Sequence, residues 1–390
     1  MPAYFRYICH LVYRRRLSTP TESAFLFGPR GTGKSTWLAD VLPDAVTYDL
    51  LDSALALQLA REPSLLATQL AAIDRRRWVV IDEIQKVPAL LDEVHRQIEK
   101  ERRRFVMSGS SARKLRRGGA NLLAGRAVQL DMFPLVSDEV GTVPPLDRLP
   151  YGMLPKAYAA AKPQRFLQAY VVTYLKEEIQ AEALTRNIGG FARFLEVAAI
   201  YNAQVTSTSN IARDAQVARQ TVQGYFDVLV DTLLGSWLHA WKLKRATKLV
   251  AHPKFYFFDA GVARALSGRL AYPPTQEEMG SIFETYLLHE IRAFLSYTER
   301  AYPLFFFRTP DDVEIDLLFE SARGMIALEL KASRTWRGEF NKGFRRIRAE
   351  LDSVRCMGVY AGDRKLKHDG VVVYPYGEFI EAMWEEKLFV

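Results

Sequence analysis

Short apolar runs that stop at polar or glycine-rich positions mark the first third of the chain. One run is Ala24 to Phe27, and two more are Trp78 to Ile81 and Phe105 to Met107. Runs of this length without alternation are typical of strands buried on both faces of a parallel sheet. Helical stretches lie between and after them, including Asp92 to Arg103. This alternation predicts a doubly wound α/β domain over residues 21–140, with ligands at the carboxyl ends of its strands.

The pattern changes after residue 140. Prolines and glycines crowd residues 141–163, which predicts a linker. Residues 164–253 carry apolar side chains at spacings of three and four, as expected for a helical domain. Residues 254–390 mix strand and helix signals, so we expect a second α/β domain there. Its three successive strands are predicted at Phe305 to Phe307, Glu314 to Phe319 and Met325 to Leu330.

Length and composition fit this division. A chain of 390 residues is too long for one compact core, and its 49% hydrophobic and 25% charged residues are ordinary for soluble globular protein. No apolar run reaches 18 residues, so no membrane association is expected. Residues 1–20 form a basic arm whose apolar stretches are interrupted by Arg6 and His10, unlike a secretory signal. With Cys9 and Cys356 read as reduced thiols, we expect a cytoplasmic protein.

A phosphate-binding loop follows the first strand directly. The run Gly28-Pro29-Arg30-Gly31-Thr32-Gly33-Lys34-Ser35, continued by Thr36, fits G-x-x-x-x-G-K-[ST] at every specified position. Glycines allow backbone N–H groups to close around phosphates, and the helix that follows presents its positive end. Lys34 would neutralise the β and γ phosphates of ATP, and the Ser35 hydroxyl would ligate Mg²⁺.

The second strand supplies the acids that this chemistry needs. The run Val79-Val80-Ile81 ends in Asp82 and Glu83. We expect Asp82 to hold Mg²⁺ directly or through water, and Glu83 to polarise the attacking water as a general base. Taken alone, an apolar strand ending in two acids is also compatible with a solvated strand end.

The third strand ends in Ser108-Gly109-Ser110-Ser111. A polar side chain at this tip would orient water near the γ-phosphate, with Ser108 the first choice and Ser110 the second. A plain turn remains the alternative, because serine is common in turns.

These elements, followed by Gly125-Arg126 ahead of Phe133-Pro134-Leu135, resemble the AAA-type ATPase domain of a large group of predicted bacterial and archaeal ATPases. The resemblance implies ATP and Mg²⁺ as cofactors and an arginine finger, Arg126, that acts in trans on a neighbouring subunit. It therefore also implies a homo-oligomer, with a hexameric ring as the favoured form. Several other arginines lie nearby, and the position of a second sensor arginine is not evident.

Within the helical region, Asn210 to Ala215 and Val217 to Phe226 predict two short helices joined by a tight turn. Their apolar positions would form a core, which makes this a winged-helix candidate. The second helix would expose the residues that could contact DNA phosphates and base edges, namely Arg219, Gln220, Thr221 and Gln223. A net charge of +8 suits a nucleic-acid partner without requiring one. A lid or a protein contact is the alternative role for this module.

The C-terminal region contains four charged residues in a characteristic order. Glu284 lies on a predicted helix, Asp316 on one predicted strand, and Glu329 and Lys331 on the next. Residues two apart on a strand face the same side, so Glu329 and Lys331 point together, and Asp316 and Glu329 could share a divalent cation. The order resembles the PD-(D/E)xK nuclease fold, although no proline precedes Asp316. A solvated strand face is the alternative.

The resemblance extends through the middle of the chain as well. The segment from the Tyr174-Leu175-Lys176-Glu177-Glu178 helix to Phe257-Phe258-Asp259-Ala260-Gly261-Val262 looks like the C-terminal region of unknown function that accompanies the same ATPase group. Three functions follow from these patterns. The first is an ATPase that remodels DNA, for example by branch migration. The second is a nuclease gated by ATP, and the third is a nucleotide-dependent switch for a protein partner with an inactive nuclease-like scaffold.

Overall fold

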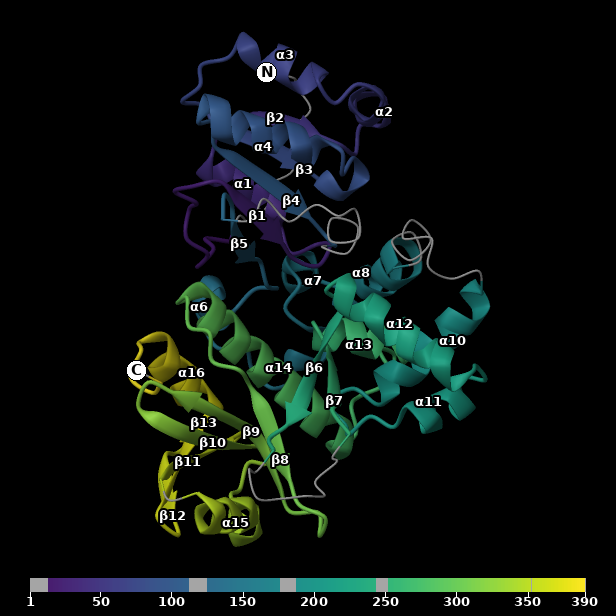
Figure 1. Cartoon of the computed structure of the whole chain (residues 1–390). Coiled ribbons are helices and arrows are strands. Elements are labelled where there is room, and N and C mark those ends of the chain that lie inside the picture. The colour runs from purple at the N-terminus through teal and green to yellow at the C-terminus, as the bar shows by residue number, and fades with distance from the viewer. Residues whose placement is uncertain (1–12, 112–124, 176–186, 243–251, 352, 390) are drawn as a thin grey trace.

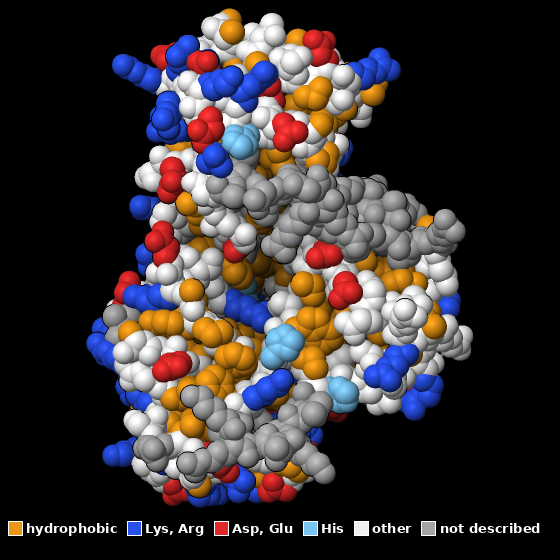
Figure 2. Space-filling view, in the orientation of Figure 1, with side chains coloured by type: hydrophobic (Ala, Val, Ile, Leu, Met, Phe, Trp, Pro, Cys, Tyr) orange, Lys and Arg blue, Asp and Glu red, His pale blue; other side chains and the backbone are white. Residues whose placement is uncertain are grey.

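A computed structural model describes residues 13–111, 125–175, 187–242, 252–351 and 353–389. Figure 1 shows an upper lobe around one sheet, and a lower part in which a second sheet lies beside a group of helices. In Figure 2 a recess lined by hydrophobic side chains lies between the two. None of the helices in these described segments is both long enough and apolar enough to cross a membrane.

The upper lobe contains a parallel five-stranded sheet in the order β2-β3-β4-β1-β5. Its strands and helices are β1 (Ala24–Phe27), α1 (Lys34–Val41), β2 (Val46–Asp49), α2 (Ser53–Arg61), α3 (Leu65–Ala71), β3 (Val79–Asp82), η2 (Ile84–Lys86), α4 (Leu90–Glu101), β4 (Phe105–Gly109) and β5 (Val128–Asp131). Every residue of β1, β3 and β4 is buried, as the unbroken apolar runs predicted. The three predicted strands and the helix after the second of them are therefore confirmed.

The segment that joins the lobes is folded rather than extended. Residues 141–163, expected to form a linker, contain η3 (Leu149–Tyr151) and α7 (Pro155–Ala159), preceded by α6 (Ser137–Val140) and followed by α8 (Pro163–Ala169) and the π-helical η4 (Tyr170–Leu175). Several of these short helices have a proline in the first turn, where the missing N–H costs nothing and the fixed φ favours helix initiation. Leu149 and Leu154 are fully buried in two different hydrophobic clusters.

The helical group comprises α10 (Ile188–Ile200), α11 (Thr208–Asp214), α12 (Arg219–Asp231) and α13 (Ala260–Leu266). The two predicted short helices are present as α11 and α12. Their predicted core residues Ile211, Val222, Phe226 and Leu229 are buried, and Val217 is partly buried against them. The side chains of Asn187 and Ser207 accept hydrogen bonds from backbone N–H groups at the starts of α10 and α11.

The second sheet has eight strands in the order β12-β13-β11-β10-β9-β8-β6-β7. They are β6 (Gly235–Ala240), β7 (Lys254–Phe257), β8 (Phe305–Arg308), β9 (Glu314–Ser321), β10 (Gly324–Lys331), β11 (Val354–Tyr360), β12 (Leu366–His368) and β13 (Val371–Pro375). The three predicted strands are present as β8, β9 and β10. The expected boundary between residues 253 and 254 falls between β6 and β7, which pair with each other in an antiparallel manner.

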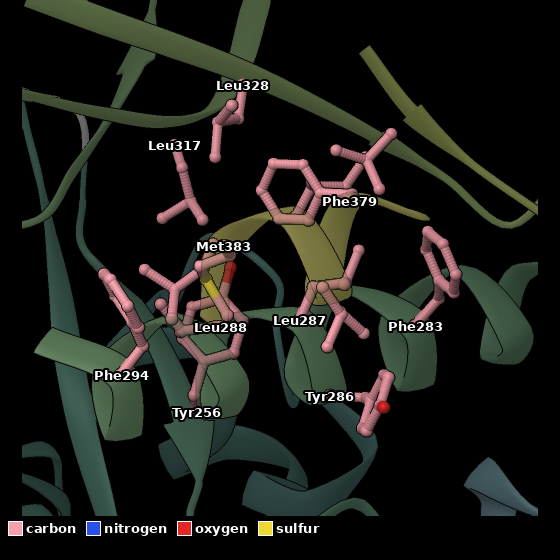
Figure 3. Close-up of a cluster of buried hydrophobic side chains, with 14 of the residues drawn as sticks. Tyr256, Phe283, Tyr286, Leu287, Leu288, Phe294, Leu317, Leu328, Phe379 and Met383 are labelled. Carbon is pink, nitrogen blue, oxygen red and sulfur yellow. The ribbon is translucent and has the colours of Figure 1, made fainter. Parts of the chain in front are cut away.

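The long helix α14 (Gln276–Tyr297) packs on this sheet together with α16 (Tyr376–Trp384), while η5 (Gly338–Asn341) and α15 (Lys342–Glu350) follow β10. Figure 3 shows Phe283, Leu287 and Leu288 of α14 in the same buried cluster as Leu328 of β10 and Phe379 of α16. Each of these five side chains is at most 2% exposed. The core therefore holds α14 against the second sheet.

Candidate nucleotide site

The loop from Gly28 to Gly33 needs glycine at the positions that the sequence motif specifies. A Cβ atom added to Gly28 would lie 2.4 Å from the Met132 carbonyl oxygen, so only glycine fits beside β5. Gly31 and Gly33 have φ angles of 84° and 95°, which side chains rarely adopt. Lys34 opens α1 directly after this loop, and its Nζ donates hydrogen bonds to the Gly28 and Pro29 carbonyl oxygens at 2.8 and 3.2 Å.

The metal-binding candidates meet at the same edge of the sheet. The Ser35 hydroxyl donates to Asp82 Oδ2 at 2.6 Å, and the Ser108 hydroxyl donates to Asp82 Oδ1. Hydroxyl and carboxylate oxygens are the ligand atoms that Mg²⁺ prefers in proteins. Ser35 and Asp82 therefore place two such oxygens next to each other and would be the residues that hold Mg²⁺.

The strand order explains why a serine lies between the loop and the acids. Because β4 is inserted between β1 and β3, its tip at Ser108 stands next to both the phosphate-binding loop and Asp82. The first-choice residue Ser108 is therefore bonded to Asp82. The second choice, Ser110, lies closer to the proposed base, with its hydroxyl 3.4 Å from Glu83 Oε2.

Glu83 is held in an unusual backbone conformation. Its φ of 59° and ψ of 46° place it in the left-handed region, which few residues other than glycine occupy. Gln85 lies two residues later, and its Nε2 donates to Glu83 Oε2 and to the Ser110 hydroxyl, the latter at 3.3 Å. Sequence reasoning missed Gln85. Its position just after the acids was the available signal.

A pocket of about 470 Å³ is lined by Lys34, Ser35 and Glu83 of this site. Its walls come from the phosphate-binding loop, the start of α1, Glu83, and residues outside the loop such as Tyr13, Leu135, Pro155 and Lys156. A volume within the 300–1,000 Å³ range is typical of small-molecule sites. The pocket therefore joins the basic arm, the upper lobe and α7 around the loop.

Arg15 is the second residue that sequence reasoning missed. Its guanidinium donates to the Thr32 carbonyl oxygen and to the Phe133 carbonyl oxygen, both at 2.6 Å. It also forms a salt bridge with Glu139 at 3.0 Å, and the two side chains are 5% and 0% exposed. Arg15 therefore ties the phosphate-binding loop to the segment that leaves β5.

Side chains of helix α14 form hydrogen bonds with the same segment that follows β5. His289 Nε2 lies 2.9 Å from the Leu135 carbonyl oxygen, and Glu290 Oε1 accepts from the backbone N–H and the hydroxyl of Ser137, each at 2.7 Å. The Tyr297 hydroxyl accepts from the Phe133 N–H at 3.2 Å. The lower part of the molecule is thus hydrogen-bonded to the segment that follows β5, next to the loop from Gly28 to Gly33.

The pKa values of two neighbouring residues of α14 are shifted in opposite directions. Burial raises the pKa of Glu290 to about 7 and lowers the pKa of His289 to about 4. The contribution of protonated Glu290 to the free energy of unfolding is fully present below about pH 4.3 and is lost as the pH rises to 7. The contribution of neutral His289 is fully present above about pH 6.5 and is lost as the pH falls to 4. Between about pH 4.5 and 6.5 the two contributions oppose each other, each with a slope of about 1.4 kcal/mol per pH unit.

We therefore expect Glu290→Gln and His289→Gln to change the pH dependence of the free energy of unfolding with opposite signs. Relative to the unsubstituted protein, Glu290→Gln should lose stability as the pH falls from 6.5 to 4.5, and His289→Gln should gain it. Urea titrations at several pH values measure both slopes. Curves that stay parallel to that of the unsubstituted protein would contradict the assignment.

Arg126 lies at the other end of the sheet. Ala24 of β1 pairs with Val128 of β5, so Arg126 precedes the start of β5, whereas the phosphate-binding loop follows the end of β1. Four residues of strand separate the two edges by about 13 Å. Within its own chain Arg126 forms a salt bridge with Glu99 of α4, and the two side chains are 35% and 46% exposed.

The predicted DNA contacts lie at the start of α12. Arg219, Gln220 and Gln223 are exposed and Thr221 is partly exposed. The Arg219 Nε donates to the Thr208 hydroxyl at 3.3 Å, which links α12 to the start of α11.

Three of the four nuclease-like residues converge on adjacent strands. Lys331 Nζ lies 3.3 Å from Asp316 Oδ2 and 2.5 Å from Glu329 Oε1. Burial, followed by the nearby Asp316, raises the pKa of Glu329 well above its usual range.

The fourth residue, Glu284, is held by a different lysine. Lys254 Nζ lies 2.8 Å from Glu284 Oε1 and 2.6 Å from Glu314 Oε1, and the Tyr256 hydroxyl also donates to Glu284. The buried ammonium group of Lys254 thus lies between two carboxylates and balances their charge in place of a metal cation. Across the segments that the structure describes, no group of three or more His, Cys, Asp or Glu residues could hold a metal ion.

Comparison with known families divides the chain into three. Residues 21–141 match a family model described as an AAA domain. The match supports an AAA-type ATPase domain at this position. Residues 146–272 and 279–379 match two models described as domains of unknown function, DUF8612 and DUF4143.

The similar proteins and solved structures give less information about function than the family models do. The chain is 27% identical over 394 residues to uncharacterized protein Rv2008c of Mycobacterium tuberculosis and to uncharacterized protein Mb2031c of Mycobacterium bovis, covering 96% of this chain and 86% of each relative. Replication initiator DnaA bound to AMPPCP and single-stranded DNA is 10% identical, with a TM-score of 0.27 over 55% of this chain and 83% of that one. Can2 from Sulfobacillus thermosulfidooxidans, in complex with cyclic tetra-adenylate, is 11% identical, with a TM-score of 0.19 over 93% of this chain and 99% of that one. Scores this low do not indicate a shared fold.

Proposed function

We propose that this protein is a Mg²⁺-dependent ATPase of the AAA type that works as an oligomer and couples ATP hydrolysis to the binding or remodelling of DNA. The observation that carries the ATPase proposal is the meeting of Lys34, Ser35, Asp82 and Glu83 at one edge of a parallel sheet, with Ser35 Oγ 2.6 Å from Asp82 Oδ2. The AAA domain match over residues 21–141 supports it independently.

Each residue then has a chemical role. Lys34 would exchange its bonds to the Gly28 and Pro29 carbonyl oxygens for bonds to the β and γ phosphates. Ser35 and Asp82 would hold Mg²⁺, which supplies charge neutralisation at the phosphates. Glu83 would accept the proton of the attacking water, while Gln85 and Ser110 hold its carboxylate in place.

The direct test is phosphate release from ATP in the presence of Mg²⁺ or EDTA, and with single-stranded, duplex or branched DNA. We expect turnover only with Mg²⁺, and stimulation by at least one form of DNA. Turnover that no DNA changes would remove the DNA part of the proposal. ATP binding without turnover or DNA binding would favour the nucleotide-dependent protein switch.

The oligomer proposal rests on where Arg126 lies. The salt bridge with Glu99 is exposed to solvent and therefore weak, so Arg126 can exchange it for a phosphate. Its distance from its own nucleotide loop favours action on a neighbour's. Such a finger contributes about 10³-fold or more to turnover.

Mixing two inactive variants should therefore restore part of the activity. Arg126→Ala keeps a complete nucleotide loop but lacks the finger, whereas Lys34→Ala keeps the finger but lacks the phosphate ligand. We expect each alone to be inactive and the mixture to hydrolyse ATP measurably. A mixture as inactive as its components would contradict action in trans.

The DNA proposal rests on the exposed polar start of α12 and on the net charge of +8. If Arg219 contacts a phosphate, Arg219→Ala should weaken binding to all sequences alike and lower the slope of log K against log salt by about 1. Fluorescence anisotropy with labelled duplex at several salt concentrations measures both. Arg213→Ala on neighbouring α11 is the matched control, because it removes the same charge from an exposed residue outside the predicted contacts. An unchanged slope for Arg219→Ala would contradict the contact.

A nuclease gated by ATP is the second candidate. The convergence of Asp316, Glu329 and Lys331 on β9 and β10 favours it, whereas the capture of Glu284 by Lys254 opposes it. Incubation of DNA with ATP and Mg²⁺ or Mn²⁺ tests it directly. Cleavage that disappears in Lys331→Ala would establish it, and intact DNA under all these conditions would exclude it.

A further inference from the structure

A second pocket, of about 300 Å³, lies behind the nucleotide loop. Its upper wall is formed by Gly28, Pro29 and the end of β5, and its lower wall by β6, β7 and α14. In Figure 2 the recess between the upper lobe and the lower part shows hydrophobic side chains at its base and a basic side chain at its edge. Pockets at the junction of two lobes are frequent ligand sites.

The lining is mostly apolar with one cation. Phe133, Phe258 and Leu288 contribute apolar surface, and the partly buried Arg292 contributes a guanidinium. Arg292 donates to the Ser236 hydroxyl and, at 3.4 Å, to the Trp237 carbonyl oxygen. Among the described residues no Asp or Glu forms an ion pair with it. Burial accordingly lowers the pKa of Arg292 to about 10.

Among the described residues, the Arg292 guanidinium therefore lacks an anionic partner. Guanidinium groups that are removed from water are normally paired with an anion, and neutral oxygens compensate only part of the lost hydration. Its planar fork suits a carboxylate in particular. Arg15, another arginine of the lobe junction, differs in this respect because it is paired with Glu139.

We propose that this pocket binds a small molecule with an apolar, preferably aromatic, body and one carboxylate group that pairs with Arg292. One guanidinium in an apolar lining matches a single negative charge better than the double charge of a phosphate monoester. The Asp131 carboxylate also lines the pocket, and its Oδ1 accepts from Gln129 at 2.9 Å. The ligand carboxylate therefore belongs at the α14 side, away from Asp131.

The test uses 2-naphthoate and 4-phenylbutyrate as probes, each compared with its neutral amide, and phenyl phosphate as the dianionic control. Binding to the full chain is followed by saturation-transfer NMR. We expect at least one carboxylate to bind at least tenfold more tightly than its amide and than phenyl phosphate. Arg292→Met should abolish that preference, whereas Arg292→Lys should retain part of it. Phe133→Trp, which enlarges one wall, should weaken acid and amide alike.

Equal binding of acids and amides, or the absence of carboxylate binding at millimolar concentration, would overturn the proposal. So would an undiminished preference for the acid in Arg292→Met. If that variant does not fold, the comparison of acid with amide on the unsubstituted protein decides alone. Tightest binding of phenyl phosphate would replace the carboxylate with a phosphate as the ligand.

A consequence for nucleotide binding rests on the proposed ATPase function. Because Gly28 and Pro29 form part of the wall, an occupied pocket should change the affinity of the loop for ATP. The dissociation constant for ATP measured with and without saturating probe tests this coupling. An unchanged constant removes the coupling but leaves the ligand site, whereas the absence of ATP binding counts against the proposed function alone.

Discussion

Replacing Glu83 with Gln is expected to lower the rate of ATP turnover by about 10²- to 10⁴-fold, the contribution of a well-placed general base. Glutamine has nearly the same shape as glutamate but cannot accept the proton of the attacking water. The phosphate ligand Lys34 and the pair of Ser35 and Asp82 are untouched by this change. The affinity for ATP should therefore stay within about threefold, because that change alters only the transition state.

Phosphate release at saturating ATP measures the turnover, and calorimetric titration with ATP measures the affinity. Glu62→Gln is the matched control, since Glu62 is an exposed acid that follows α2 in the same lobe. It should leave both quantities unchanged. A Glu83→Gln protein that keeps more than a tenth of the turnover would show that another group activates the water.

Replacing Arg15 with Met should lower the free energy of unfolding by about 3–5 kcal/mol. Removal of this arginine leaves the fully buried Glu139 without its cation, and the carbonyl oxygens of Thr32 and Phe133 lose their donor. Because Thr32 belongs to the phosphate-binding loop, the affinity for ATP should fall as well. Urea unfolding and calorimetric titration measure the two effects.

The adjacent residue offers a control with the same chemistry in a different environment. Arg16 pairs with Asp138, but these side chains are 47% and 37% exposed. Arg16→Met should therefore cost no more than about 1 kcal/mol. Equal losses of stability in the two variants would mean that burial of the Arg15 pair is not what makes it important.

The parts of the site that the sequence predicted are those in which neighbours in the chain are also neighbours in space. Gly28 to Ser35 form one loop, and Asp82 and Glu83 end one strand, so their spacing alone revealed them. Gln85 contacts Glu83 only two residues away and was overlooked, whereas Arg15 acts through contacts that the spacing does not encode. Arg15 lies 17 residues before Thr32 and 118 before Phe133. One arginine among several in a basic arm gives no local signal of that role.

The fold shows the same division. The strands β1, β3 and β4 were predictable because strands buried on both faces must be apolar throughout. β2, with the sequence Val-Thr-Tyr-Asp, lies at the edge of the sheet and has only one buried residue, so it lacks such a run. Similarly, Lys254 gave no sign of its place between Glu284 and Glu314, which lie far along the chain. Its contacts arise only when β7 and α14 come together.

The position of β6 limits how the protein can be divided. This strand belongs to the middle of the chain but lies between β7 and β8 in the second sheet. A fragment that starts at residue 254 would leave one side of β8 with unpaired backbone groups and β7 without its neighbour. Exposed strand edges of this kind recruit other chains and promote aggregation. The middle and C-terminal segments are therefore one folding unit, and genetic truncation between them should yield insoluble material rather than a separate domain.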